Sequence, residues 1–199
     1  MSEELLRQWV RKCVEAGSFT NHGKFVRDAE KKVAAAIENS HFVSIFGSKV
    51  VGTAIAIWLC RNSVSSIDGL SDKSILSFRE FLGTNRIAAD ADCPRKNYKT
   101  LSVIENLNVG DLENIKADTA NDIIVIQSLI ISKKYYSLHQ DLDYAIVLSR
   151  SLEDHKALVS MRSSYGADEH ITEVTATMNG RPSELIGLAI QHSLQSSQN

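Results

Sequence analysis

The first part of the chain repeats apolar side chains with the period of an α-helix. Between residues 3 and 16 they fall at i, i+1, i+4, i+5, i+8 and i+9, namely Leu5, Leu6, Trp9, Val10, Cys13 and Val14. This spacing predicts an amphipathic helix that begins after Ser2 and ends at Gly17. A second helix is expected after Asn21, with an apolar face made of Phe25, Val26, Ala29, Val33, Ala34 and Ile37.

Residues 42–60 are the most hydrophobic stretch of the chain, and Lys49 is the charged residue within it. Its continuous apolar run is shorter than the roughly 20 residues that a membrane-spanning helix needs. We therefore expect a buried helix rather than a transmembrane segment. Gly52 and Ala56 would let a neighbouring helix approach it closely.

Further helical patterns follow along the chain. Residues 75–82 suit a short helix, and apolar faces at helical spacing cover residues 112–130 and 142–161. The β-branched content of residues 171–178 leaves helix or strand open there. Pro182 lies at a first-turn position and opens a last helix through Leu194. Residues 84–110, with Pro94 and Gly110, are the least regular part, and residues 101–107 within them suit a strand or a short helix.

The composition agrees with a soluble helical protein. The 199 residues are 43% hydrophobic and 23% charged, which suits one globular domain. The low counts of 2 Pro and 10 Gly argue against an all-β chain with many turns. We predict a mostly α fold, a multi-helix bundle with an irregular segment near 84–110. Residues 1–180 would form a single helical domain, and residues 181–199 a C-terminal helix and tail, docked or free.

The net charge and the cysteine content bear on the expected partners and cellular location of the protein. The net charge of −2 provides no dominant basic field for nucleic acid. The 3 cysteines are odd in number and widely spaced, which favours a reducing compartment. The acidic start has no apolar run behind it, so no signal peptide is expected. These features predict a cytoplasmic protein, or a virion component if it is coat-like, without a membrane partner.

The sequence shows no convincing catalytic or metal-binding pattern. Residues 46–52 contain Gly, Ser and Lys, but not in the order of a phosphate-binding loop, and a dinucleotide fingerprint is missing. Cys93, in a polar loop before Pro94, is the plausible nucleophile, but no activating base is near it in sequence. We predict no catalytic residue, no metal site and no cofactor. The acidic clusters fit helix starts better than zinc or calcium spacings: Asp90, Asp92 and Cys93; His139, Asp141 and Asp143; Asp168, Glu169, His170 and Glu173.

Two modest groups of basic residues include aromatic side chains. A candidate nucleic-acid surface consists of Arg86, Arg95, Lys96 and Lys99, with Tyr98 among them. A second group is Lys133, Lys134, Tyr135 and Tyr136. Residues 81–87, Phe-Leu-Gly-Thr-Asn-Arg-Ile, resemble a segment of rod-shaped plant-virus coat proteins in which arginines contact packaged RNA. Thr84 stands where that family would have a further arginine.

The last helix resembles a ubiquitin-interacting motif. That family presents a large apolar residue, an Ala three positions later and a Ser four positions beyond it, and Ile186, Ala189 and Ser193 fit these places. The resemblance implies a partner-binding helix that also uses Ile190. Leu142, Ala145 and Ser149 repeat the spacing. The last helix departs from the family because it lacks a carboxylate at its end, and the inner repeat departs because it has Arg150 where an apolar residue is common.

These observations lead to three hypotheses of different class. The first is a non-enzymatic, self-assembling structural or interaction protein, a homo-oligomer that is coat-like and uses RNA as its anionic partner. The second is a ubiquitin-binding adaptor that works through the last helix. The third, with the weakest support, is a small hydrolase or metal enzyme built on Cys93 or on the cluster from Asp168 to Glu173.

Overall fold

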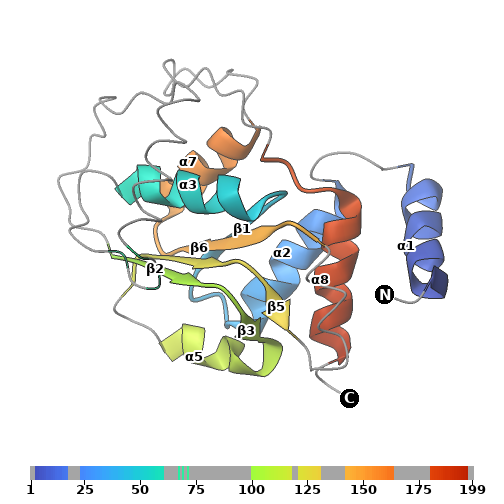
Figure 1. Ribbon diagram of the computed structural model, residues 1–199, viewed down its shortest axis with the longest axis horizontal. Helices are drawn as coiled ribbons and strands as arrows, with labels where there is room; N and C mark the ends of the chain where they lie inside the picture. Colours follow the sequence, from blue (N-terminus) through green and yellow to red (C-terminus); the bar gives the residue numbers. More distant parts are fainter. Residues whose placement is uncertain are drawn as a thin grey trace.

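The computed structural model describes residues 3–17, 23–60, 67, 69, 71, 100–117, 121–130, 142–163 and 180–196. In these residues a β-sheet lies between two layers of helices (Figure 1). The elements in chain order are α1 (Glu3–Glu15), α2 (Lys24–Ala36), β1 (Phe42–Phe46), α3 (Lys49–Cys60), β2 (Leu101–Ile104), β3 (Leu107–Asn108), the 3-10 turn η1 (Val109–Asp111), α5 (Leu112–Ala117), β4 (Ile123–Ile126), β5 (Leu129–Ile130), β6 (Ala145–Ser149), α7 (Leu152–Ser163) and α8 (Glu184–Ser196).

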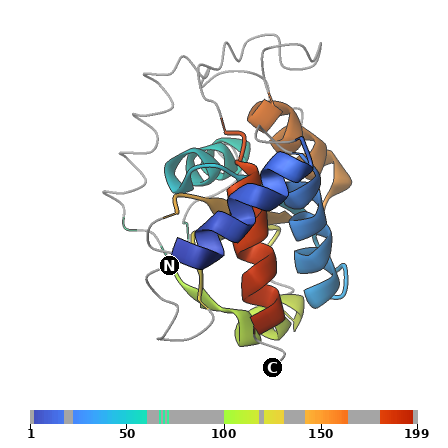
Figure 2. The same cartoon turned by 90° about the vertical axis from the view of Figure 1, so that its right-hand side faces the viewer.

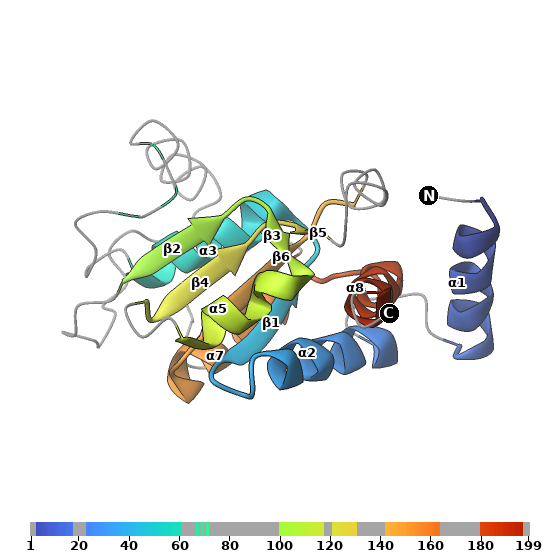
Figure 3. The same cartoon turned by 90° about the horizontal axis from the view of Figure 1, so that it is seen from below.

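The main sheet has four strands in the order β1-β6-β4-β2. Strand β6 runs antiparallel to both of its neighbours, whereas β2 and β4 are parallel. Strands β1, β4 and β2 therefore all point the same way. The short parallel pair β3 and β5 continues beyond the ends of β2 and β4 (Figure 3).

Both faces of the main sheet are buried. Helices α3 and α7 cover one face, and α2, α5 and α8 lie on the other (Figure 1). Strand β4 shows the alternation, because Ile123 and Val125 belong to the core under α3, and Ile124 and Ile126 to the core under α2 and α8. A strand buried on both faces is apolar at every position, which explains the Ile-Ile-Val-Ile sequence of β4.

Helix α8 is held tightly against α2. A Cβ atom on Gly187 would lie 2.5 Å from the carbonyl carbon of Phe25, so only glycine permits this approach. The carboxylate of Glu184 accepts the Phe25 N–H at 2.7 Å and thereby caps the first turn of α2. Helix α1 crosses α8 on the outside of the molecule and buries Trp9 and Cys13 there (Figure 2).

The predicted multi-helix bundle is wrong, because four of the apolar segments are strands of a mixed sheet. Residues 123–126 and 145–149 were expected in helices but form the two central strands β4 and β6. Continuous apolar runs do not distinguish a strand buried on both faces from a buried helix. In the expected helix over residues 142–161, the helix starts only at Leu152.

Other predicted elements are confirmed. Helices α1, α2 and α8 lie where the amphipathic pattern and Pro182 predicted them, and Gly17 follows α1 with a positive φ of 62°. The hydrophobic stretch 42–60 divides into β1 and α3, and Gly52 packs against Ala145 of a strand rather than against a helix. No helix in the described part of the chain is long and apolar enough to cross a membrane.

Several predictions concern residues outside the described ones, among them residues 75–82, most of 84–110 and all of 171–178. Within 84–110, residues 101–104 form β2. The division of the chain at residue 180 into a domain and a C-terminal helix stays a prediction, although α8 lies against α2 and the sheet.

A buried ion pair joins α2, β1 and α7. The guanidinium of Arg162, 1% exposed, contacts the carboxylate of Glu30 at 2.5 Å. The same carboxylate accepts the Ile45 N–H at 3.0 Å, and Arg162 donates to the Ile45 carbonyl at 2.9 Å. The two side chains thus satisfy the N–H and the carbonyl of Ile45, which lie on the side of β1 that faces away from β6.

We expect Glu30→Gln to lower the free energy of unfolding by about 3–5 kcal/mol, because it removes the charge that compensates a buried guanidinium. Urea unfolding of the purified protein measures this change. Glu38→Gln is the matched control, since the Glu38–Lys116 pair is 68% and 46% exposed and should cost less than about 1 kcal/mol. Equal losses in the two variants would contradict the assigned role of Glu30.

Candidate functional site

The carboxyl ends of the parallel strands meet at one edge of the sheet. Phe46 ends β1 opposite Ala145, the first residue of β6, while Ile126 of β4 pairs with both Ile146 and Ile104. In open α/β sheets, ligands bind outside the carboxyl ends of the strands. We call this region the carboxyl edge, and it is the first place to look for a site.

Helix α3 starts at the carboxyl edge, separated from β1 by Gly47 and Ser48. Its first turn contains no acidic residue, so its own sequence does not balance the partial positive charge of a helix N-terminus. Asp143, just before β6, supplies the missing charge: its Oδ1 atom accepts the Lys49 N–H at 2.8 Å. An anionic oxygen is therefore bound at the start of α3.

The chain leading into α8 passes over the end of β1. The Gly47 N–H donates to the Gly180 carbonyl at 2.9 Å. A Cβ atom on Gly47 would lie 2.5 Å from the carbonyl oxygen of Arg181, so a larger residue would push this segment away. Lys49 and Arg181 both belong to this region of the chain, together with the carboxylate of Asp143.

Polar groups also follow β4. The Gln127 side chain donates to the hydroxyl of Thr53 on α3 at 3.0 Å, and the Leu107 N–H donates to the Ser128 carbonyl at 2.9 Å. The fully buried hydroxyl of Tyr144 accepts the Leu129 N–H at 3.0 Å. Burial raises the pKa of Tyr144 to about 12 against the opposing effect of its hydrogen bonds with the Leu129 backbone and the Ser128 side chain, so the phenol stays protonated at neutral pH.

The chemistry of the carboxyl edge is that of an anion-binding surface. It offers backbone N–H groups at a helix start that begins with Lys49, and the neutral polar pair of Gln127 and Thr53. In the described part of the chain, no three His, Cys, Asp or Glu side chains converge to hold a metal ion. The arrangement suits a ligand with a negatively charged end.

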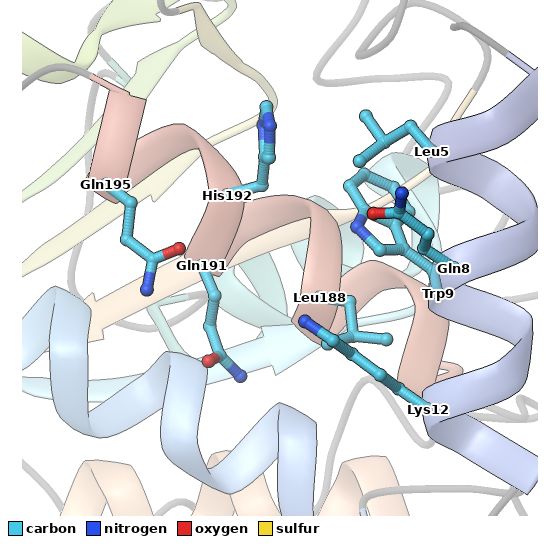
Figure 4. Close-up of a pocket in the computed structure, with 8 residues that line it drawn as sticks. All are labelled: Leu5, Gln8, Trp9, Lys12, Leu188, Gln191, His192 and Gln195. Atoms are coloured by element: carbon cyan, nitrogen blue, oxygen red, sulfur yellow. The ribbon is translucent and has the colours of Figure 1, made fainter.

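A second concave surface lies between α1 and α8. This groove has a volume of about 280 Å³ and is lined by Leu5, Gln8, Trp9, Lys12, Leu188, Gln191, His192 and Gln195 (Figure 4). Trp9 and His192 meet edge to face with ring centres 5.8 Å apart. Burial, and secondly the charge of Lys12, lower the pKa of His192, so its imidazole is neutral at pH 7.

Most of the predicted site residues are not among the residues that the structure describes. Arg86, Arg95, Lys96 and Lys99 lie outside the described residues, as do Cys93, the cluster of residues 168–173, and His139 and Asp141. Of the predicted acidic clusters, Asp143 is described, and it caps a helix. The four residues of the predicted partner-binding face are buried in the interior: Ile186, Ala189, Ile190 and Ser193.

Sequence reasoning missed the contact between Lys49 and Asp143, which are 94 positions apart. One local signal was present: a run of aromatic and β-branched residues ends in Gly47-Ser48, and a long apolar segment follows at once. Interpreted as a strand, a turn and a helix, it would have indicated a βα unit with a ligand-binding turn.

Three comparisons with known proteins bear on this fold. A structure of DesI with its TDP-sugar product is similar with a TM-score of 0.67 and 11% identity, covering 100% of this chain and 59% of DesI. PseC, an aminotransferase from Helicobacter pylori involved in pseudoaminic acid biosynthesis, is similar with a TM-score of 0.59 and 12% identity. The match covers 96% of this chain and 62% of PseC. A GDP-4-keto-6-deoxymannose-3-dehydratase with a PLP-glutamate geminal diamine is similar with a TM-score of 0.56 and 14% identity. The match covers 100% of this chain and 67% of the dehydratase. No protein-family model and no curated protein matches the sequence.

These similarities establish the fold. The chain has the α/β fold of pyridoxal phosphate (PLP)-dependent aminotransferases and sugar dehydratases, and it spans about three fifths of the length of DesI. The prediction of a non-enzymatic, coat-like assembly protein is wrong, because the similar structures are enzymes. The resemblances to a ubiquitin-interacting motif and to coat proteins are wrong as well, and in α8 the Ile–Ala–Ser spacing serves packing. Homo-oligomer formation and cytoplasmic location stay predictions.

We expect Tyr144→Phe to cost about 1–3 kcal/mol at neutral pH, because the Leu129 N–H loses its buried acceptor. The folded pKa is raised, so the stability that Tyr144 contributes is full below about pH 10 and is lost as the pH rises to about 12. Urea unfolding across this range should show a steeper alkaline loss in the wild type than in the variant. A difference in the free energy of unfolding between the two proteins that does not change with pH would contradict the raised pKa of Tyr144.

We expect Lys12→Gln to raise the pKa of His192 while leaving it below 6.5, because burial is the larger cause of the shift. The folded pKa is lowered, so the contribution of His192 to stability is present above pH 6.5 and is lost as the pH falls through the folded pKa. NMR titration of the imidazole ring measures the change. Lys32→Gln is the control, since Lys32 binds Gln191 from α2; an equal shift in both variants would contradict the assignment.

Proposed function

We propose that this chain is the cofactor-binding part of a PLP-dependent enzyme that transfers an amino group to a nucleotide-linked sugar or removes a hydroxyl group from one. The observation that carries the proposal is the similarity of the whole chain to DesI, with a TM-score of 0.67. DesI was determined with a TDP-sugar product, and the similar dehydratase acts on a GDP-linked sugar. The carboxyl edge is the site at which this function would reside.

The donor groups of the carboxyl edge fit the anionic end of PLP. A phosphate at a helix N-terminus is held by backbone N–H groups and by the helix dipole. The Lys49 N–H already binds an anionic oxygen, since Asp143 Oδ1 lies 2.8 Å from it. The carboxylate therefore stands in for a phosphate oxygen at the start of α3.

The chemistry that PLP supplies when bound is an electron sink for the bond that breaks at the substrate. The protein's own residues would bind and orient. The Lys49 N–H and the α3 dipole would hold the phosphate, and the Lys49 side chain would add positive charge. Gln127, already joined to Thr53, offers an amide at the end of β4, and the buried Tyr144–Leu129 hydrogen bond keeps β6 fixed against β5.

In PLP enzymes the side chain of a lysine also holds the cofactor. Lys133 and Lys134 belong to residues 131–141, which join β5 to β6 and are not among the described residues. Ile130 ends β5, and Leu142 precedes β6, whose first residue Ala145 lies at the carboxyl edge. We therefore assign the amine to Lys133 or Lys134 rather than to Lys49, which begins α3.

The test is covalent labelling. The purified protein is mixed with PLP, reduced with borohydride and digested, and mass spectrometry locates the modified lysine. We expect close to one PLP per chain on Lys133 or Lys134, and a loss of that label when the residue is changed to arginine. Lys116→Arg is the control, because Lys116 lies on α5 and pairs with Glu38.

Label distributed over several surface lysines, and unchanged by Lys133→Arg and Lys134→Arg, would overturn the proposed function. Label on Lys49 alone would preserve PLP binding but contradict the assigned amine. Incubation of the PLP-loaded protein with a nucleotide-linked keto sugar and glutamate then distinguishes the two reactions. An aminated sugar indicates an aminotransferase, and a deoxygenated sugar indicates a dehydratase.

A further inference from the structure

The contact between Asp143 and Lys49 occupies the position at which the anionic end of the ligand would bind. Asp143 Oδ1 lies 2.8 Å from the Lys49 nitrogen and is an acidic group facing the first turn of α3, which contains no acidic residue of its own. A phosphate that used the same N–H would bring a second negative charge to within a few ångströms of the carboxylate. Like charges at that distance repel each other, by about 1 kcal/mol where both face water.

We propose that Asp143 is a built-in competitor for the phosphate of the cofactor, so that the start of α3 is held either by this carboxylate or by the ligand. The inference rests on the proposed function and concerns the regulation of its site. Loading of the protein then requires Asp143 to leave the Lys49 N–H. The contact is autoinhibitory: it stabilises the unliganded state and weakens binding.

The surroundings of Asp143 determine how it can leave. The next residue, Tyr144, is fully buried and hydrogen-bonded to Leu129, so the backbone at the start of β6 is fixed. The Asp143 side chain itself is exposed. Rotation of this side chain into water is therefore the available movement, and it costs little because the solvent rehydrates the carboxylate. The competitor is released without unfolding of the sheet.

The experiment compares Asp143→Asn and Asp143→Ala with the wild type, using inorganic phosphate and PLP as separate probes. Asparagine keeps a hydrogen-bond acceptor for Lys49 and removes the charge, so it tests the competition with little risk to folding. We expect PLP to bind about two- to fivefold more tightly to Asp143→Asn, the size of effect typical of one charge at a helix end. We also expect phosphate to shift the NMR signal of the Lys49 amide in this variant more than in the wild type.

Asp122→Asn is the matched control. Asp122 also accepts a backbone N–H, that of Thr100 at 3.0 Å, but it precedes β4 and lies at the opposite end of the strands. Its substitution should leave phosphate and PLP binding unchanged. Circular dichroism of all variants confirms that the helices are retained.

Unchanged or weaker binding of both probes to Asp143→Asn would overturn the proposal and indicate that Asp143 helps to prepare the site. An equal gain in Asp122→Asn would also overturn it, because the effect would then reflect net charge. Failure of the proposed function looks different. In that case borohydride fixes no PLP on a specific lysine in any variant, while phosphate still shifts the Lys49 amide more strongly in Asp143→Asn.

Discussion

The position of β1 depends on the carboxylate of Glu30. Strand β1 is the outer strand of the main sheet, and its Ile45 N–H and carbonyl point away from β6. The Glu30 carboxylate accepts the Ile45 N–H, and Arg162 donates to the Ile45 carbonyl. The two side chains also form an ion pair with each other. Unpaired backbone groups on an outer strand invite pairing with another chain. Here a helix from each side of the sheet satisfies them.

The location of the candidate site follows from this arrangement. Because β1 is fixed between α2 and α7, the turn after it places the start of α3 at the carboxyl edge. Asp143 reaches that start from the other side, since β6 begins where β1 ends. The close contact of Gly47 with Arg181 brings the chain before α8 to the same place. Three separate parts of the sequence thus converge on one helix N-terminus.

The amphipathic helices of this chain are predictable from its sequence, whereas the central strands are not. Helices α1 and α2 were predictable because each has one buried and one exposed face, and an amphipathic period is a property of the local sequence alone. Strands β4 and β6 were not, because the sheet is covered on both faces and every residue of these strands is buried. Their sequences carry no period of two that could mark them as strands.

The candidate site shows the same limit more strongly. Local motifs such as the Ile–Ala–Ser spacing of α8 resembled a binding surface, although these side chains pack in the interior. The groups that do face one another, Lys49 and Asp143, are 94 residues apart and carry no local signature.

The sequence by itself determined the amphipathic helices, the apolar core segments and the absence of a strong overall charge, because these depend only on the order and kind of neighbouring residues. Only the tertiary structure decided which apolar segments pair as strands and which polar groups meet at the carboxyl edge. Strand pairing and side-chain convergence depend on contacts between distant residues, and those contacts exist only once both faces of the sheet are covered.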